Sequence, residues 1–166
     1  MDVVRTYLEL TAPHGLRPAG PPAGDVSLAR VHTCPPSRYR ALYAAVGEAY
    51  HWRDRLAWSD ARLAEHLADP RVAVWTAVVR GETAGYFELV RHSDGSVEIA
   101  YFGLLPAFHG RGLGKWLLTR ATEEAWAMGA NRVWLQTCTL DHPAALPNYE
   151  ARGFVPFHRE TYRVAM

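Results

Sequence analysis

The sequence has almost no excess charge and no long apolar run, and each shortage excludes a class of protein. Lysine and arginine number 18 against 17 aspartates and glutamates, and the basic residues are scattered. The chain therefore lacks the positive surface that binds nucleic acid. No window approaches the length of a membrane span, and the N-terminal segment alternates apolar and polar residues, unlike a secretion signal. We expect a cytoplasmic protein with neither a nucleic-acid partner nor membrane contact.

Cysteine is also scarce. Cys34 and Cys138 stand at no spacing that fits a metal site, so we expect two free thiols and no metal. Internal repeats and low-complexity tracts are absent from the sequence. What the 166 residues do have is apolar content, with 49% hydrophobic and 21% charged residues, which suits one compact domain. We expect that domain to span residues 1–166.

Hydrophobic periodicity alternates between two and 3.6 residues, which is typical of a mixed α/β domain. Strands are expected at Val3–Thr11, Val26–Thr33, Val72–Arg80, Ala84–Arg91 and Ser96–Leu104. Helices are expected at Pro36–Ala49 and Asp60–Ala68, the second with Ser59 or Asp60 as its cap. Turn signals around Gly81 and Gly95 join three of the strands into an antiparallel meander. The segment Gly15–Gly24 is rich in proline and glycine and predicts a surface loop.

The segment HGRGLGK, residues 109–115, combines three glycines with two basic residues just before a helical pattern that Gly129 ends. A strand at Arg132–Thr139 follows. Such a strand, loop, helix and strand should bring the two strands parallel and direct the first N–H groups of the helix at a ligand in the loop. The glycines let an anion approach the backbone, and Arg111 and Lys115 add charge. A phosphate or pyrophosphate is the expected ligand.

Three phosphate-loop patterns compete for this segment. The P-loop pattern fails, because His109 replaces its first glycine and Trp116 replaces its hydroxyl residue. The dinucleotide pattern GxGxxG is broken at Lys115 and conflicts with the antiparallel hairpins upstream. The third pattern, [QR]xxGx[GA], is met by Gly112 and Gly114, with His109 where Gln or Arg is usual. A glycine turn that merely joins a strand to a helix is the structural alternative.

The third pattern is the pyrophosphate loop of the GNAT acetyltransferase superfamily, which this sequence resembles. A second block, PNYEARGF at residues 147–154, is similar to the family's short helix with a tyrosine, followed by Gly-Phe opening the last strands. The resemblance covers nearly the whole chain and implies the α/β (α+β) GNAT acyl-CoA N-acyltransferase fold. In that fold helices flank a twisted mixed sheet that is splayed between the family's fourth and fifth strands, here Ser96–Leu104 and Arg132–Thr139. Acetyl-CoA, the cosubstrate, lies in the cleft.

The resemblance also implies a coenzyme site. Its residues are Phe102, Gly103, Leu104, His109, Gly110, Arg111, Gly112, Leu113, Gly114, Lys115 and His142. The loop would take the pyrophosphate, and the backbone of residues 102–104 would pair with the pantetheine arm. Gly103 favours a bulge that directs the Leu104 N–H at the thioester carbonyl, with a packing compromise as the alternative. His142 stands where many members have asparagine, and a capping or surface role is its alternative.

Glu98 precedes His109 by eleven residues, as a catalytic glutamate precedes the loop in histone-acetylating members of the family. The resemblance therefore implies that Glu98 is the general base. Strand alternation predicts that Glu98 shares a face with Ala100 and Phe102. Glu88 is the second candidate, as a base or as an ammonium-binding group. Either glutamate could instead pair with an arginine such as Arg53 or Arg55.

The resemblance implies that Tyr149 protonates the leaving thiolate, with simple packing of its ring as the alternative. We expect the helix that carries Tyr149 at about Ala144–Arg152. Family acceptors contact the first two helices and the loop between them. Tyr50 and Trp52 lie there beside Trp58, as candidates for an acceptor pocket or for plain packing.

The resemblance implies an acetyl-CoA-dependent N-acetyltransferase that acts on a primary amine of a small molecule or peptide, by direct attack in a ternary complex. A non-catalytic acyl-CoA-binding module, a longer acyl chain and a homodimer remain open alternatives.

Overall fold

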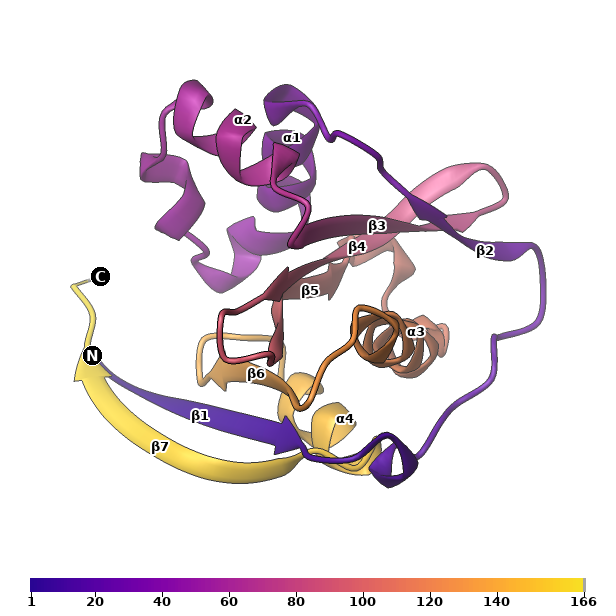
Figure 1. Ribbon diagram of the computed structural model, residues 1–166, viewed down its shortest axis with the longest axis vertical. Coiled ribbons are helices and arrows are strands. Elements are labelled where there is room, and N and C mark those ends of the chain that lie inside the picture. Colours follow the sequence, from indigo (N-terminus) through magenta and orange to yellow (C-terminus); the bar gives the residue numbers. More distant parts are fainter. Residues whose placement is uncertain (166) are drawn as a thin grey trace.

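Two tight hairpins build the centre of a seven-stranded sheet in the computed structural model, which describes residues 1–165 (Figure 1). The four consecutive antiparallel strands are β2 (Val26–Arg30), β3 (Val72–Val79), β4 (Glu82–Arg91) and β5 (Val97–Leu104). Gly81 and Gly95 turn the hairpins with φ of +80° and +85°, a conformation that favours glycine. The predicted meander is confirmed. β2 ends before the predicted Thr33, whose φ of 48° is not that of a strand.

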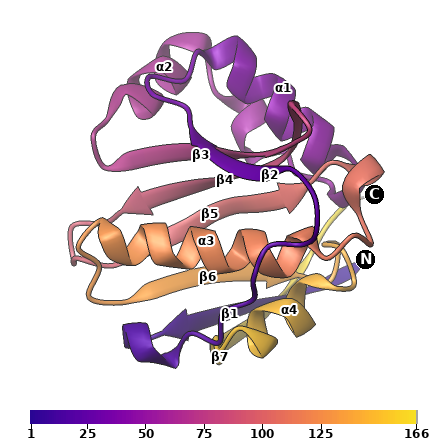
Figure 2. The ribbon, with the colours of Figure 1, turned by 90° about the vertical axis from the view of Figure 1, so that its right-hand side faces the viewer.

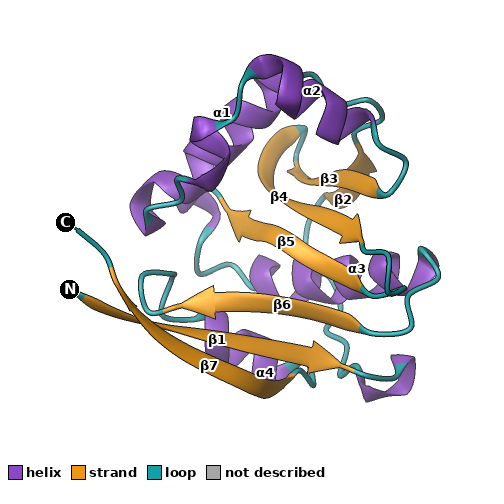
Figure 3. Ribbon diagram, turned by 60° about the vertical axis from the view of Figure 1, so that its left-hand side comes forward, coloured by secondary structure: helices purple, strands orange, loops and turns teal. Residues whose placement is uncertain are grey.

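The predicted crossover connects β5 through α3 (Leu113–Ala127) to β6 (Val133–Cys138), and β6 runs parallel to β5. Gly129, with φ of +82°, follows the end of α3 as expected. The parallel ladder pairs only Val97 with Val133 and Glu98 with Trp134. Beyond these pairs the two strands separate (Figure 3), which confirms the predicted splay.

The far side of the sheet is completed by the two ends of the chain. β1 (Asp2–Leu10) lies between β6 and β7 (Val155–Arg163) and is antiparallel to both. The family resemblance implies more than one strand after Phe154, but β7 alone follows, and its partner comes from the start of the chain. Strand patterns do not reveal a partner so distant in sequence.

The connection from β1 to β2 crosses the molecule. The two strands lie in different halves of the sheet, in the order β2-β3-β4-β5-β6-β1-β7. Residues 11–25 therefore pass over α3 (Figure 2), where the Ala19 N–H donates to Thr119 Oγ1 at 3.0 Å. The predicted loop at Gly15–Gly24 lies within this crossing segment.

Helices cover both faces of the sheet. α1 (Pro36–Gly47) and α2 (Asp60–Ala68) lie on one face, and α3 and α4 (Ala145–Ala151) lie on the other (Figure 1). Ser59 caps α2, because its Oγ accepts the Arg62 N–H at 3.1 Å. Between α1 and α2 the chain makes two 3₁₀ turns, Glu48–Tyr50 and Asp54–Ala57. Among the helices of residues 1–165, none is long and apolar enough to span a membrane.

Candidate active site

Two cavities open where β5 and β6 separate. The first, of about 470 Å³, lies between the end of β5, residues 109–115 and α4, and is called the loop cavity below. The second, of about 340 Å³, lies between residues 50–54, the middle of β5 and the end of β6, and is called the aromatic cavity. The residues that line both cavities are Tyr50, Trp52, Phe102, Asp141 and Tyr149. These five residues mark the junction of the two spaces.

The loop cavity contains the N-terminus of α3. Gly110 and Gly112 have φ of +74° and +76°, and Gly112 is the residue before the first helical turn. No side chain caps this helix and no acidic residue lies in its first turn, so its N–H groups remain available to an anion. Lys115 lines the cavity, whereas the Arg111 guanidinium lies over the Phe108 ring at 5.2 Å and is not among the lining residues. All other residues expected to bind the coenzyme line this cavity.

Side-chain hydrogen bonds fix the glycine loop to its surroundings. His109 Nε2 lies 3.2 Å from the carbonyl oxygen of Leu104, and Asn148 Nδ2 donates to the carbonyl of Gly114 at 3.2 Å. The Leu105 N–H donates to Ala84 on β4 at 2.8 Å. Because N–H groups alternate between the two edges of a strand, the Leu104 N–H is directed to the opposite edge, where β5 has left β6.

The bulge in β5 lies at Ala100 and not at Gly103. Glu88 pairs with Tyr101 and Leu89 pairs with Ile99, which leaves Ala100 without an opposite residue. A Cβ on Gly103 would come within 2.5 Å of Val46 Cγ1, so the absence of a side chain there makes room for α1. Packing against α1 thus accounts for Gly103.

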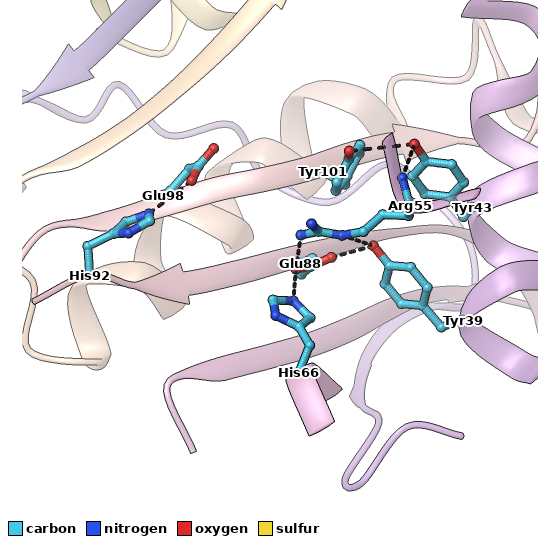
Figure 4. A network of polar contacts seen from close by, with 8 residues as sticks. All are labelled: Tyr39, Tyr43, Arg55, His66, Glu88, His92, Glu98 and Tyr101. Atoms are coloured by element: carbon cyan, nitrogen blue, oxygen red, sulfur yellow. Dashed lines mark hydrogen bonds and ion pairs between the residues drawn. The ribbon is translucent and has the colours of Figure 1, made fainter. Parts of the chain in front are cut away.

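This bulge reverses the alternation that underlies the prediction for Glu98. Ile99 and Phe102 pack in the same cluster on the α3 side, so Glu98 lies on the opposite face from Phe102. The predicted shared face is wrong for this reason. The Glu98 side chain is 14% exposed, and its carboxylate lies 2.9 Å from His92 Nε2 (Figure 4). Glu98 is not among the residues that line either cavity.

Glu88 is fully buried beneath α1 and α2 and also lies outside the lining of both cavities. Its carboxylate accepts hydrogen bonds from Tyr39 and from Arg55 Nη2 (3.0 Å), and lies 2.6 Å from His66 Nε2 (Figure 4). Burial acts to raise the pKa of Glu88, but His66, Arg55 and Tyr39 together lower it. The pairing with Arg55 was one of the sequence alternatives. Glu98, in contrast, pairs with a histidine.

Tyr149 lies on α4 at the junction of the cavities. Its ring packs edge-on against Phe102 at 6.2 Å and Phe154 at 6.5 Å. Burial raises the pKa of the Tyr149 hydroxyl, and the charge of Asp141 raises it further. The hydroxyl therefore stays protonated at neutral pH and is available as a proton donor.

The aromatic residues between α1 and α2 divide into two groups. Tyr50 and Trp52 line both cavities. Trp52 fits against Gly47, where a Cβ would come within 2.4 Å of the indole. Trp58 lines neither cavity and packs between the guanidinium groups of Arg55 and Arg62, at 4.1 and 4.0 Å.

The structure adds site residues that sequence reasoning did not assign. Asp141 lines both cavities, and Asn148, inside the PNYEARGF block, lines the loop cavity. His142 lines the loop cavity, and its Nδ1 accepts the Ala144 N–H at 3.0 Å just before α4, but it does not cap the helix, whose N-cap is Ala144. The one sequence signal for Asp141 is its place shortly after the end of a strand, β6, that borders the splay.

Comparisons with known proteins agree with this geometry. Residues 39–154 match the acetyltransferase (GNAT) family. An uncharacterized N-acetyltransferase of Mycobacterium tuberculosis is 44% identical over 77 residues, which are 46% of this chain and 49% of that protein. The match thus spans about half the length of the curated relative.

Two solved structures share the fold. A GCN5-related N-acetyltransferase from Kribbella flavida, 23% identical, has a TM-score of 0.68 over 92% of this chain and 54% of its own. An aminoglycoside acetyltransferase from an uncultured soil metagenomic sample, 15% identical, has a TM-score of 0.61 over 76% of this chain and 86% of its own. At these identities the likeness concerns the fold alone.

Proposed function

Because the chain belongs to the acetyltransferase (GNAT) family, we propose that it transfers the acetyl group of acetyl-CoA to a primary amine of a small molecule or peptide. The observation that carries this proposal is the meeting of two cavities at Tyr149. One cavity contains a helix N-terminus without a side-chain cap, and the other is lined by aromatic and charged side chains. Such an arrangement suits a ternary complex, in which donor and acceptor are bound together.

The hydrogen-bond donors of the loop cavity suit acetyl-CoA. Backbone N–H groups at the start of α3 and the Lys115 ammonium would hold the pyrophosphate. The free edge of β5 at Phe102 and Leu104 would pair with the amides of the pantetheine arm. Acetyl-CoA supplies an activated thioester when it is bound.

The protein's own groups would then act on the transfer. The Leu104 N–H at the open edge is the candidate donor to the oxygen on which negative charge develops, and a donor of this kind contributes about 3 kcal/mol. Tyr149 is the candidate acid for the departing sulfur. The role of Glu98 as general base stays a prediction of the sequence. Glu98 contacts His92 and is not among the residues that line the two cavities.

The acceptor would enter through the aromatic cavity. Tyr50 and Trp52 offer ring faces to an alkylammonium or to a ring at the junction, and Asp54 and Asp141 offer carboxylates. The fold is shared with an aminoglycoside acetyltransferase, so aminoglycosides belong in an acceptor screen together with polyamines, amino acids and peptides.

The test is thiol release from acetyl-CoA by the purified protein in the presence of each amine class, with mass spectrometry of the amine. The proposal predicts release of one thiol for each acetyl group gained by the acceptor. Binding of acetyl-CoA without release, across all amine classes, would indicate the non-catalytic binding module instead.

A further inference from the structure

A carboxylate stands at the point where donor and acceptor must meet. Asp141 follows β6 and is the only carboxylate, among residues 1–165, that lines both the loop cavity and the aromatic cavity. We propose that Asp141 is the general base, which takes up the proton of the attacking amine. This inference rests on the proposed function and names the group that completes its chemistry.

The Asp141 side chain is held in place by hydrogen bonds to one of its two carboxylate oxygens. Its Oδ2 accepts the Thr137 hydroxyl at 2.6 Å and the Cys138 N–H at 3.0 Å, both at the end of β6. Within the described chain, Oδ1 makes no hydrogen bond to a donor, which leaves this oxygen for a ligand. A carboxylate that is anchored through one oxygen and open at the other is oriented for proton transfer.

The other proton-accepting groups of the two cavities are less suitably placed. They are His51, Asp54 and Cys138, which line only the aromatic cavity, and His109 and His142, which line only the loop cavity. His109 Nε2 is engaged by the Leu104 carbonyl and His142 Nδ1 by the Ala144 N–H. Glu88 and Glu98 line neither cavity. The amine must cross the junction to reach the thioester, and Asp141 is there.

The proton balance of the reaction uses Asp141 and Tyr149 as a pair. The neutral amine forms a C–N bond to the acetyl carbon, and the C–S bond breaks with its electron pair on sulfur. The amine nitrogen gives one proton to Asp141, and the sulfur receives one proton from Tyr149. Asp141 then releases its proton to water and the Tyr149 phenolate takes one up, so the products are the amide and the free thiol.

The surroundings of Tyr149 suit an acid, and those of Asp141 fix its position. Burial and the charge of Asp141 raise the pKa of Tyr149 and keep the acid protonated. The Thr137 hydroxyl and the Cys138 N–H both donate to Asp141 Oδ2 and hold this carboxylate at the junction of the cavities.

The experiment compares Asp141→Asn with Asp94→Asn. An asparagine at position 141 keeps an oxygen for Thr137 and Cys138 but cannot accept the amine proton. Asp94 is a matched control, because its Oδ1 also accepts one hydroxyl (2.6 Å) and one N–H (2.9 Å), both from Ser96, and it lines neither cavity. Thiol release is measured across pH with spermidine, kanamycin and alanylalanine as probe amines, and acetyl-CoA affinity is measured by calorimetry.

For each probe that the wild type acetylates, Asp141→Asn should lower kcat about 100-fold at the pH where the wild type is fastest. The acetyl-CoA affinity of Asp141→Asn should equal that of the wild type. The Asp94→Asn variant should equal the wild type in both kcat and acetyl-CoA affinity. A wild-type rate in Asp141→Asn would overturn the assignment, as would a similar loss of rate in Glu98→Gln alone. If none of the probe amines makes the wild type release thiol, the proposed function itself fails, and the assignment of Asp141 fails with it.

Discussion

Tyr149 is the residue proposed to protonate the departing sulfur. Replacing it with phenylalanine keeps the ring contacts to Phe102 and Phe154 and removes only the proton donor. We expect kcat to fall about 100-fold, the low end for general acid catalysis, because a thiolate is a moderately good leaving group. Steady-state kinetics with an identified acceptor, beside a melting curve, measure this. Full activity in a well-folded Tyr149→Phe protein would remove Tyr149 from the chemistry.

A substitution at Gly103 tests whether packing against α1 requires glycine at this position. An added methyl group would overlap Val46, so Gly103→Ala should lower the free energy of unfolding by about 1–3 kcal/mol. In a Val46→Ala background the same change should cost less, since the colliding methyl group is gone. Urea unfolding of the two single variants and the double variant gives the coupling energy. Additive effects would show that Val46 is not the reason for glycine at position 103.

Among the elements, the end of β5 and the glycine loop are linked by one side chain. His109 contacts the Leu104 carbonyl, and Leu104 offers the N–H proposed to face the thioester. We expect His109→Ala to weaken acetyl-CoA binding about fivefold, the effect of losing one hydrogen bond. His109→Gln restores a donor and should recover most of the affinity in a calorimetric titration. If Gln binds no better than Ala, the hydrogen bond does not support the site.

The elements also show where sequence reasoning succeeds. The meander, the α3 crossover and the cap at Ser59 depend on local signals, namely turn glycines, apolar periodicity and a capping hydroxyl. The pairing of β1 with β7 and the bulge at Ala100 depend on contacts between distant segments. A one-residue bulge moves every later side chain to the other face of the strand. Regular alternation, which ignores the bulge, therefore places Glu98 and Phe102 wrongly on one face.

The candidate site was likewise predicted in part. The glycine loop and Tyr149 belong to sequence blocks with a recognisable pattern, and the structure brings both to one cavity. Asp141 belongs to no such block. Its position at the junction follows from where β6 ends relative to β5, which is a property of the folded sheet.

At the scale of the whole molecule, Glu88 joins α1, α2 and the sheet through Tyr39, His66 and Arg55. Its pKa is lower in the folded protein than the unfolded value of about 4.3. The stability it contributes is therefore present above that value and is lost as the pH falls through the folded pKa. Urea unfolding in this acid range should show the loss in the wild type.

Glu88→Gln should be less stable at neutral pH by about 3 kcal/mol, because Arg55 loses its buried partner. The variant should also lose less stability on acidification than the wild type. Identical acid dependence in the two proteins would mean that other carboxylates cause the loss.

The most direct measurement is acetyl-CoA binding by the wild type, Gly112→Asn and Gly112→Asp, by calorimetry with melting curves of the free proteins. Both substitutions place a side chain of the same size at φ of +76°, but only aspartate adds negative charge at the start of α3. We predict that acetyl-CoA binds the wild type and, more weakly, the Asn variant, and that it does not bind a folded Asp variant. Equal binding by all three proteins would contradict the assignment of the α3 loop to the pyrophosphate.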